Sequence, residues 1–296
     1  MLAARLLGWL ARGIRGPVRD AMLSDAAAPE ARGRAFGLHR ALDSLGAVLG
    51  PVAAAAILAR SSLHAVFWWS LVPGVLSALA FAAFVRPQRA GPAHHQHPLP
   101  DAIAMLPPAF RRFLVAAFAF GLGDFARSLL ILRATNVLAP GFGAAPAAAI
   151  AVALYALHNV VYALASYPVG WWADRTDAKA LLLVGYVLGT ATAVLAAAAR
   201  PSIVFLGVLF ATGGLTLAFV DTLEGVLTAA FVPAAVRGTG FGVLAATNGV
   251  GDLLSSSAVG IVWATAGPVA AFVGAAGLCA VGAAALLQLD SVEKAA

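Results

Sequence analysis

Long apolar runs, separated by short polar connections, constrain the fold of this chain more than any other feature. A transmembrane helix needs about 20 mostly apolar residues, and the sequence contains eight runs of about this length. Hydrophobic residues make up 61% of the 296 positions and charged residues 11%, whereas soluble domains average about 45–50% and about 25%. This balance excludes a soluble globular domain and a disordered chain, and it predicts an all-α, polytopic membrane protein. The runs are residues 36–59, 64–85, 110–133, 146–169, 180–199, 202–225, 238–263 and 267–289.

The N-terminal stretch, residues 1–24, is a weaker ninth candidate. Arginines interrupt its apolar residues, and each arginine at the centre of a bilayer costs about 2.5–3.5 kcal/mol on insertion scales. Alone, the stretch is typical of an amphipathic helix that lies in the membrane interface. Counting it as a helix gives about nine helices in all. The arginines are Arg5, Arg12, Arg15 and Arg19.

Basic residues are distributed unevenly between alternate loops. One set of loops carries ten of them, and the other set carries only Arg60, Arg133 and Arg200. Because basic residues collect on the cytoplasmic side of membrane proteins, we expect the first set and the C-terminus to face the cytoplasm from a bacterial inner membrane. The net charge of +6 then reflects topology, and nucleic-acid binding is not expected. The ten are Arg32, Arg34, Arg86, Arg89, Arg111, Arg112, Arg175, Lys179, Arg237 and Lys294.

The longest polar segment, residues 86–109, is rich in proline and histidine and is typical of a flexible linker. Clustered imidazoles can bind Zn²⁺ or Ni²⁺, but a linker whose nearest carboxylate is Asp101 is a poor site. The single cysteine, Cys279, lies in an apolar run and offers no disulfide. We therefore expect no metal site and no cofactor. The histidines are His94, His95 and His97.

The chain contains an internal repeat. Residues 32–46 (RGRAFGLHRALDSLG) match residues 237–251 (RGTGFGVLAATNGVG) at a constant offset of 205 positions. A period of this length is typical of transporters built from two parallel halves. The matching pairs are Arg32 and Arg237, Gly33 and Gly238, Phe36 and Phe241, Gly37 and Gly242, and Gly46 and Gly251.

The repeat also predicts how the chain is divided. Four apolar runs separate the linker from the second copy, but only residues 1–24 precede the first copy. The counterparts of three helices are therefore missing from the first half. We expect a partial first half at residues 1–86 (helices 4–6 of a twelve-helix plan), a cytoplasmic linker at 87–109, and a six-helix second half at 110–296.

One loop resembles the cytoplasmic signature loop of the major facilitator superfamily. It is the segment GWWADRTDAK, with Gly170, Asp174, Arg175 and Lys179 at motif positions. The resemblance implies that Asp174 latches a gate by accepting N–H groups from the start of the fifth helix, near Gly33. Free N–H groups and the helix dipole favour a carboxylate at such a place. The alternative is a loop that Arg175 and Lys179 merely hold on the cytoplasmic side.

A second motif, Gly46-Ala-Val-Leu-Gly50-Pro51, resembles the Gly-x-x-x-Gly-Pro motif of the superfamily's fifth helix, which is associated with antiporters. The spacing puts both glycines on one face, where a neighbouring helix can approach closely, and Pro51 can bend the helix. The alternative is ordinary packing of small residues. Residues 15–37 resemble a poorly characterised prokaryotic branch of the superfamily. Together these resemblances imply a member that lacks the first three helices.

Ionisable side chains within the apolar runs are candidate functional groups, because burying them in a bilayer is costly. Asp124 and Arg127 are three residues apart, and either pair structurally or contribute to a substrate site. Asp221 and Glu224 share a helix face; two close carboxylates suit proton binding and release, unless both are hydrated near the headgroups. Asp43 is a further candidate, or it simply pairs with neighbouring Arg40.

Two other polar patterns are candidates. Asn248 and Asp252 share one helix face, and Asp252, with no cation nearby in sequence, is the more interesting carboxylate; with Asp221 it is the expected site of proton coupling. A polar and aromatic stripe either lines a substrate cavity or holds helices together through hydrogen bonds. The stripe consists of Tyr155, His158, Asn159 and Tyr162.

The expected function is secondary active transport by alternating access, more specifically proton-coupled efflux of small molecules. An uptake permease and a truncated, non-transporting fragment or partner protein are the alternatives. An enzyme is not expected, because the chain has neither Gly-x-Ser-x-Gly nor His-Glu-x-x-His, and no phosphate-binding loop. The expected partners are the lipid bilayer, a small-molecule substrate and protons, and the sequence leaves the oligomeric state open.

Overall fold

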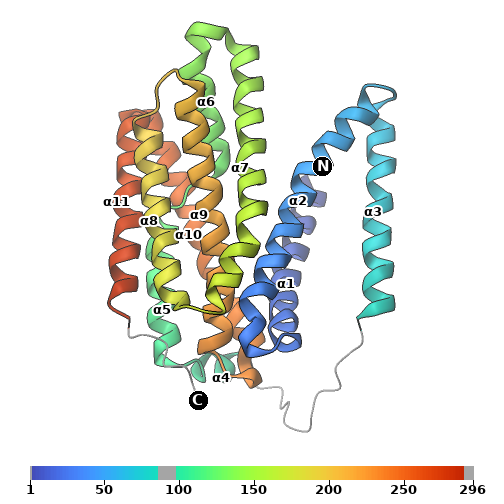
Figure 1. Cartoon of the computed structure of the whole chain (residues 1–296), viewed down its shortest axis with the longest axis vertical. Helices are drawn as coiled ribbons and strands as arrows, with labels where there is room; N and C mark the ends of the chain where they lie inside the picture. The colour runs from blue at the N-terminus through green and yellow to red at the C-terminus, as the bar shows by residue number, and fades with distance from the viewer. Residues whose placement is uncertain (1, 86–97, 290–296) are drawn as a thin grey trace.

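The computed structural model describes residues 2–85 and 98–289, with side chains from residue 13 onward. All regular secondary structure in this part of the chain is helical (Figure 1), which confirms the predicted all-α class. The α-helices are α1 (Leu2–Ala26), α2 (Arg32–Leu58), α3 (Leu63–Phe84), α4 (Leu99–Ala104), α5 (Pro108–Gly121), α6 (Arg127–Phe142), α7 (Ala144–Ala173), α8 (Ala178–Ala197), α9 (Ile203–Phe231), α10 (Arg237–Ala266) and α11 (Pro268–Leu287).

Within the described residues, six helical segments are long and apolar enough to cross a membrane. The N-terminal helix α1 is not among them, in keeping with its arginines. This is the architecture of a multi-pass helical membrane protein, as expected. The six are Pro29–Leu58, Leu63–Phe84, Ala144–Ala173, Ala178–Ala197, Ile203–Phe231 and Pro268–Leu287.

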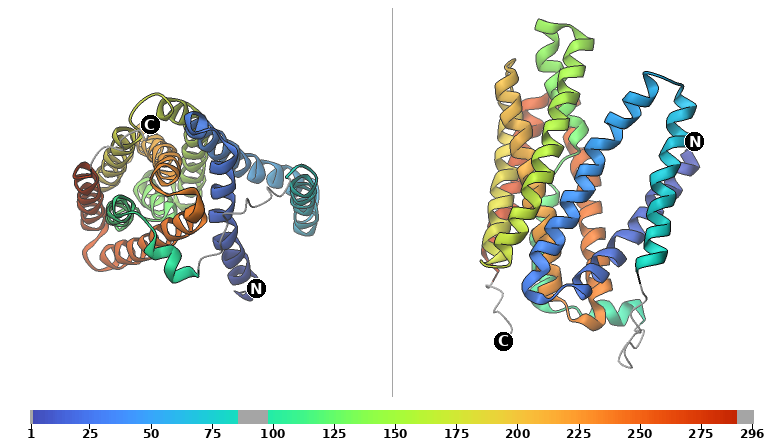
Figure 2. Two further views of the ribbon diagram at one scale, coloured as in Figure 1. Left: turned by 90° about the horizontal axis from the view of Figure 1, so that it is seen from below. Right: turned by 45° about the vertical axis from the view of Figure 1, so that its right-hand side comes forward.

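Helices α5 to α11 form one bundle, and α1 to α3 lie along one side of it (Figures 1 and 2). We call the end of the bundle that carries α4 the lower end, as drawn in Figure 1. Helices α1 and α2 contact α7, α9 and α10 towards this end, and α2 then diverges from the bundle. Helix α3 stands apart, and none of its residues is buried.

The run at residues 110–133 was expected to be one continuous helix, and this is wrong. Helix α5 ends at Gly121 and α6 begins at Arg127. Side chains satisfy the freed backbone groups, since Arg127 donates to the Phe125 carbonyl (2.7 Å) and Ser256 Oγ accepts from Ala126 N (3.0 Å). Gly123 permits the break to press against α11, because a Cβ there would lie 2.5 Å from the Ala275 carbonyl oxygen.

The expected linker is helical over its last part. Helix α4 and the start of α5 lie within residues 98–109, and Ala102 and Leu106, one helical turn apart, are buried in the core. Arg111 donates to carbonyls at the C-terminal end of α4, including that of Ala104 at 2.8 Å, and to the Leu106 carbonyl beyond it (3.1 Å). Residues 98–109 are therefore a packed element and not a flexible segment. His94, His95 and His97 lie outside the described residues.

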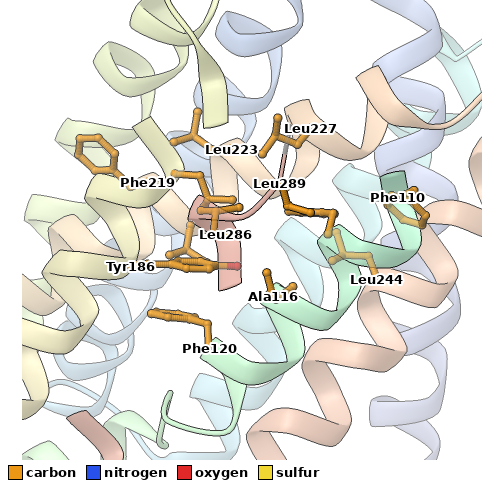
Figure 3. Packing of buried hydrophobic residues seen from close by; sticks show 14 of the residues in the cluster. Phe110, Ala116, Phe120, Tyr186, Phe219, Leu223, Leu227, Leu244, Leu286 and Leu289 are labelled. Atoms are coloured by element: carbon orange, nitrogen blue, oxygen red, sulfur yellow. The ribbon is translucent and has the colours of Figure 1, made fainter. Parts of the chain in front are cut away.

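Leucine and alanine side chains, together with the aromatic rings of Phe110, Phe120, Tyr186 and Phe219, fill the lower half of the bundle (Figure 3). The rings of Phe120 and Tyr186 are stacked, with their centroids 4.0 Å apart and an angle of 6° between the planes. Gly189 makes room for this pair, since a Cβ there would lie 2.6 Å from Phe120. This packing ties the end of α5 firmly to α8.

The internal repeat extends well beyond the matching sequence. Helices α1 and α9 end at Ala26 and Phe231, and the 3₁₀ turns that follow cover Pro29–Ala31 and Ala234–Val236. Helices α2 and α10 begin with Arg32 and Arg237, and α3 and α11 begin with Leu63 and Pro268. Each boundary pair is again 205 residues apart. Helices α1–α3 are thus the structural counterparts of α9–α11.

We expect Arg133→Ala to destabilise the C-terminal end of α8. Arg133 on α6 donates to the carbonyls of Ala196 (3.1 Å), Ala197 (3.3 Å) and Ala199 (3.5 Å), where a cation also interacts favourably with the helix dipole. The loss should be about 1 kcal/mol of unfolding free energy. Faster hydrogen exchange at residues 196–199 would report it. Arg200→Ala, which removes an exposed arginine stacked on Phe205, is the control and should leave exchange there unchanged.

Candidate functional site

Asp174 joins the two parts of the molecule at the lower end. It is the C-cap residue of α7, and its carboxylate faces the first turn of α2. Oδ1 accepts from Gly33 N (2.6 Å), and Oδ2 accepts from Arg34 N (3.1 Å) and Arg34 Nε (2.8 Å). The first N–H groups of a helix have no partner within it, so this carboxylate satisfies two of them. Its side chain is only 4% exposed.

Small residues allow α2 and α7 to touch backbone to backbone beside Asp174. A Cβ on Gly170 would overlap the Gly33 carbonyl oxygen, and a Cβ on Gly33 would overlap that of Gly170. One turn further along, Gly37 lies directly against the Ser166 carbonyl. We call these residues, with Asp174, the α2–α7 contact.

The basic residues of the signature loop, Arg175 and Lys179, contact other parts of the molecule. Arg175 stacks on the Trp171 ring, 3.8 Å from its centroid. Lys179 Nζ donates to the Leu289 carbonyl, and so connects the start of α8 to the end of α11. Neither residue contributes to the α2–α7 contact.

A second set of polar contacts joins α1 and α2 to α9 and α10. Arg237, at the start of α10, forms an ion pair with Asp25 at the end of α1. Its repeat counterpart, Arg32, donates to the carbonyls of Ser24 and Ala229, both at 3.3 Å. The lower end is therefore closed by contacts that use both copies of the repeat.

The repeat partners Phe36 and Phe241 meet just above these contacts. Their ring centroids are 5.9 Å apart, and both side chains are buried. Gly225 makes room for Phe36, since a Cβ there would lie 2.8 Å from the ring. The phenylalanine pair separates the lower end from a cavity of about 120 Å³.

This central cavity is lined by residues of four helices, α1, α2, α9 and α10. From the first part of the chain come Asp20 and Arg40, which form an ion pair at 3.1 Å. From the second part come Asp221, Glu224 and Asn248. The cavity therefore has charged walls on both sides of the boundary between the repeats.

The acidic residues of α9 have separate partners. Tyr162 donates to Asp221 Oδ2 (2.5 Å). Glu224 is buried and accepts from Asn248 Nδ2 (2.6 Å) and the Tyr186 hydroxyl (3.2 Å). Hydration of Glu224 near the headgroups, one of the alternatives considered above, does not fit this burial. Each carboxylate is held in place by neutral hydrogen-bond donors.

Asp20 and Arg40 were not among the sequence candidates. Arg40 was considered only as a partner for Asp43, but it pairs with Asp20 instead, and Asp43 is exposed. The repeat relates Asp20 and Arg40 to Gly225 and Ala245, at the offset of 205 residues. All four residues line the cavity, so a comparison of the two copies could have identified the charged pair. At each pair of symmetric positions one copy has a charge and the other a very small residue.

Asp124 and Arg127 form the pair that their spacing suggested, but they lie at the break between α5 and α6. The two terminal guanidinium nitrogens of Arg127 donate to the Asp124 carboxylate, at 2.7 and 3.1 Å. The pair borders a small cavity of about 20 Å³, which is room for roughly one water molecule. Asp252 is exposed and lies within electrostatic reach of this pair and of Asp221.

The four residues of the stripe on α7 have different neighbours. His158 is buried, with Nδ1 3.1 Å from the Phe210 carbonyl of α9, and its ring stacks on Tyr155. Asn159 donates to the Tyr155 carbonyl of its own helix (2.8 Å), whereas Tyr162 reaches Asp221. The arrangement corresponds to the second alternative, hydrogen bonding between helices, for His158 and Tyr162.

The Gly46, Gly50 and Pro51 motif lies on the outer half of α2. A Cβ on either glycine would meet nothing within 4 Å among the described residues, and all three positions are exposed. Within the part of the chain that the structure describes, no helix packs closely on this motif. Its surroundings differ from those of Gly33 and Gly37 on the same helix because α2 has left the bundle at this height (Figure 1).

Comparisons with known proteins agree with this architecture. The family model of the Major Facilitator Superfamily matches residues 1–143 and 113–296. An uncharacterised transporter of the same type from Methanocaldococcus jannaschii, MJ1317, is 30% identical over 181 residues, which are 60% of this chain and 44% of that protein. The chain thus spans less than half the length of this curated relative.

Two solved structures share the fold at low sequence identity. The human organic anion transporter MFSD10 has a TM-score of 0.73 and 18% identity, over 97% of this chain and 70% of that one. FucP in its outward conformation has a TM-score of 0.68 and 14% identity, over 93% and 72%. With the repeat, the helical architecture and a family match along the whole sequence, the chain belongs to the Major Facilitator Superfamily.

Proposed function

We propose that the chain acts in secondary active transport by alternating access, with the central cavity between the two repeats as the site of exchange. The observation that carries the proposal is the closed lower end: α1 and α2 contact the bundle there, below a cavity with charged walls. FucP in an outward conformation has a similar fold. This similarity supports assigning an outward-open conformation, closed at the lower end, to this chain.

We further propose that the lower end faces the cytoplasm of a bacterial inner membrane. The starts of α2, α5, α8 and α10 and the end of α7 lie at this end, and they carry most of the basic residues of the described loops. Basic loops are retained on the cytoplasmic side. The C-terminus then lies in the cytoplasm, because α11 ends at the same end (Figure 1).

Proton-coupled efflux of a small molecule is the most specific form of the proposal. Glu224 and Asp221 line the cavity, and each accepts a hydrogen bond from a neutral donor. Protonation of a buried carboxylate is a common means of coupling transport to protons. The test is a panel of small molecules applied to proteoliposomes that contain an internal pH dye. Proton movement driven by one of them supports coupling, and its direction distinguishes efflux from uptake. Binding without any transport would favour the non-transporting alternative.

We expect Asp174→Asn to open the lower end. Hydrogen bonds to a charged group contribute about 1.5–3 kcal/mol each, and losing that charge should shift the equilibrium towards the open state by about 10–100-fold. The measurement is maleimide labelling, from the lower side of oriented vesicles, of an Ala245→Cys variant that also carries Cys279→Ala. Ala245 lines the central cavity, so faster labelling reports opening.

Asp177→Asn is the matched control for this experiment. Asp177 lies in the same loop, but among the described residues its side chain accepts only from Lys179 N (2.9 Å) at the start of α8. Its replacement should leave labelling unchanged. If the cysteine at position 245 is labelled at the same rate with and without Asp174→Asn, Asp174 is not a latch, and the loop only sets the topology.

A further inference from the structure

We infer that the small cavity at the break between α5 and α6 is a binding site for one sodium ion. The cavity has a volume of about 20 Å³ and shares no lining residue with the central cavity. The inference therefore goes beyond the proposed transport function and does not depend on it. It rests on the oxygen atoms that three helices and the broken segment bring to one place, and on the charges around them.

The broken segment supplies oxygen atoms from its backbone and from one carboxylate. Gly123, Asp124 and Phe125 lie between α5 and α6, and all three line the cavity. Gly123 is buried, and its carbonyl accepts no hydrogen bond from any residue that the structure describes. Buried carbonyl groups nearly always have an electropositive partner, and the unwound parts of broken membrane helices are places where carbonyls bind cations.

Two buried threonines, Thr192 of α8 and Thr216 of α9, also line the cavity. Thr192 Oγ1 donates to the Leu188 carbonyl of its own helix (2.8 Å). Thr216 Oγ1 likewise donates to the Thr212 carbonyl (3.0 Å), and the two hydroxyl oxygens lie 3.3 Å apart. A hydroxyl has a single proton, so neither has one left for the contact between them. Two acceptor oxygens that meet in this way are stabilised by a cation bound to both.

The charges around the cavity favour a monovalent cation. Arg127 neutralises Asp124 through their ion pair, but Asp252, which also interacts electrostatically with Arg127, has no ion pair among the described residues. Each Asp124 carboxylate oxygen accepts one bond from Arg127, so lone pairs remain on both oxygens for a further ligand. A calcium ion takes about 6–8 oxygen ligands, which is more than this set provides.

The size of the cavity favours sodium over potassium. A volume with room for roughly one water molecule accommodates a sodium ion, whereas a potassium ion forms longer bonds to oxygen. The walls are also held in place by close packing. A Cβ on Gly189 would lie 2.6 Å from Phe120, and one on Gly213 would lie 3.1 Å from His158. Selectivity between cations depends on such limits to cavity size and on the number of ligands.

The test measures sodium binding directly on the full chain, purified in lipid nanodiscs. One measurement counts bound radioactive sodium at equilibrium. The other follows thermal unfolding with a maleimide dye that reacts with Cys279, the single cysteine of the chain, when unfolding exposes it. Sodium chloride is compared with potassium chloride and choline chloride at the same ionic strength, so that general effects of salt cancel.

We expect one bound sodium ion per chain and an unfolding temperature that rises with sodium concentration until it saturates, because a ligand that binds only the folded state stabilises that state. Thr216→Val and Thr192→Val each remove one oxygen from the cavity with little change in side-chain shape. Each should weaken sodium binding by about 10–100-fold, the effect of losing an interaction with a charged group. Thr216→Ser, which keeps the hydroxyl, should retain binding.

Matched controls lie on the same two helices. Thr190 of α8 and Thr212 of α9 also donate to carbonyls of their own helices, but neither lines the cavity. Thr190→Val and Thr212→Val should therefore leave the sodium affinity unchanged. Should one of the cavity variants fold poorly, the other tests the same pair of oxygens.

Two results would overturn the inference. Equal unfolding temperatures in sodium chloride and choline chloride, without bound radioactive sodium, would show that the cavity binds water only. Sodium binding that persists in both Thr192→Val and Thr216→Val would place the ion elsewhere. Proton movement in proteoliposomes is a separate measurement, so failure of the proposed transport function would leave these results unaffected.

Discussion

Gly170→Ala should prevent the lower end from closing. The added Cβ would overlap the carbonyl oxygen of Gly33, which belongs to the backbone of α2 and cannot turn aside as a flexible side chain can. The two helices must then separate, and the hydrogen bonds from Gly33 N and Arg34 N to Asp174 are lost together. Because charge-assisted hydrogen bonds contribute about 1.5–3 kcal/mol each, opening should be favoured by at least about 100-fold.

The measurement is again maleimide labelling at Ala245→Cys, combined with the transport assay. We expect fast labelling from the lower side and loss of transport, because a protein that cannot close this end cannot alternate. The reciprocal variant Gly33→Ala should behave in the same way, since its Cβ would overlap the Gly170 carbonyl oxygen. Abundance in the membrane and elution as a single species would show that the variants fold.

Gly50→Ala is the control for the added methyl group. It lies on α2 as well, but its Cβ would meet nothing within 4 Å among the described residues. Labelling and transport should remain unchanged. Equal behaviour of the Gly170 and Gly50 variants would show that the α2–α7 contact does not control access to the cavity.

Glu224→Gln should abolish proton movement while leaving the site able to bind. Glutamine has the size of glutamate: its Oε1 can still accept from Asn248 Nδ2, and its amide nitrogen can donate to the Tyr186 hydroxyl oxygen, the two groups that contact the carboxylate now. It cannot, however, take up or release a proton. With a substrate identified from the panel, we expect proton movement to fall by about 10–100-fold, the effect expected when a proton-transfer group is lost. Substrate binding, measured by calorimetry on the same variant, should persist.

The Asp252→Asn variant distinguishes Asp252 from Glu224 as the residue that couples transport to protons. From the sequence alone Asp252 and Asp221 are the expected coupling groups, whereas the structure shows Asp252 exposed and without a hydrogen bond or ion pair among the described residues. We expect this variant to retain proton movement. Retention by Glu224→Gln and loss by Asp252→Asn would reverse the assignment, and retention by both would point to Asp221.

Much of the architecture could be read from periodicity and from the repeat. Eight runs and an N-terminal stretch anticipate the helices, because an apolar segment of membrane-spanning length has few other stable conformations in a bilayer. The Asp174 contact with the start of α2 also has the geometry that the family resemblance implied. The first is a local feature that depends on spacing along the chain, whereas the second joins residues 141 positions apart and was expected from the family resemblance.

The sequence-based predictions that the structure contradicts have a common physical origin. The run that contains Gly121, Gly123 and Asp124 is apolar enough for one helix, but packing against α11 and side-chain bonds to freed backbone groups make a break stable. Arg40 has Asp43 as its nearest acidic neighbour in sequence, yet it pairs with Asp20 of α1. In each case a group on another helix decides between alternatives that are close in energy locally.

The amino-acid sequence thus establishes a helical membrane protein with two related parts, because hydrophobicity and repeat spacing are properties of the chain itself. The tertiary structure alone decides which polar side chains meet, and so places Asp20, Arg40, Asp221 and Glu224 around one cavity. It also distinguishes glycines at a backbone contact, such as Gly170, from glycines in open space, such as Gly50. These differences depend on the distance between helices, and spacing along the sequence does not encode that distance.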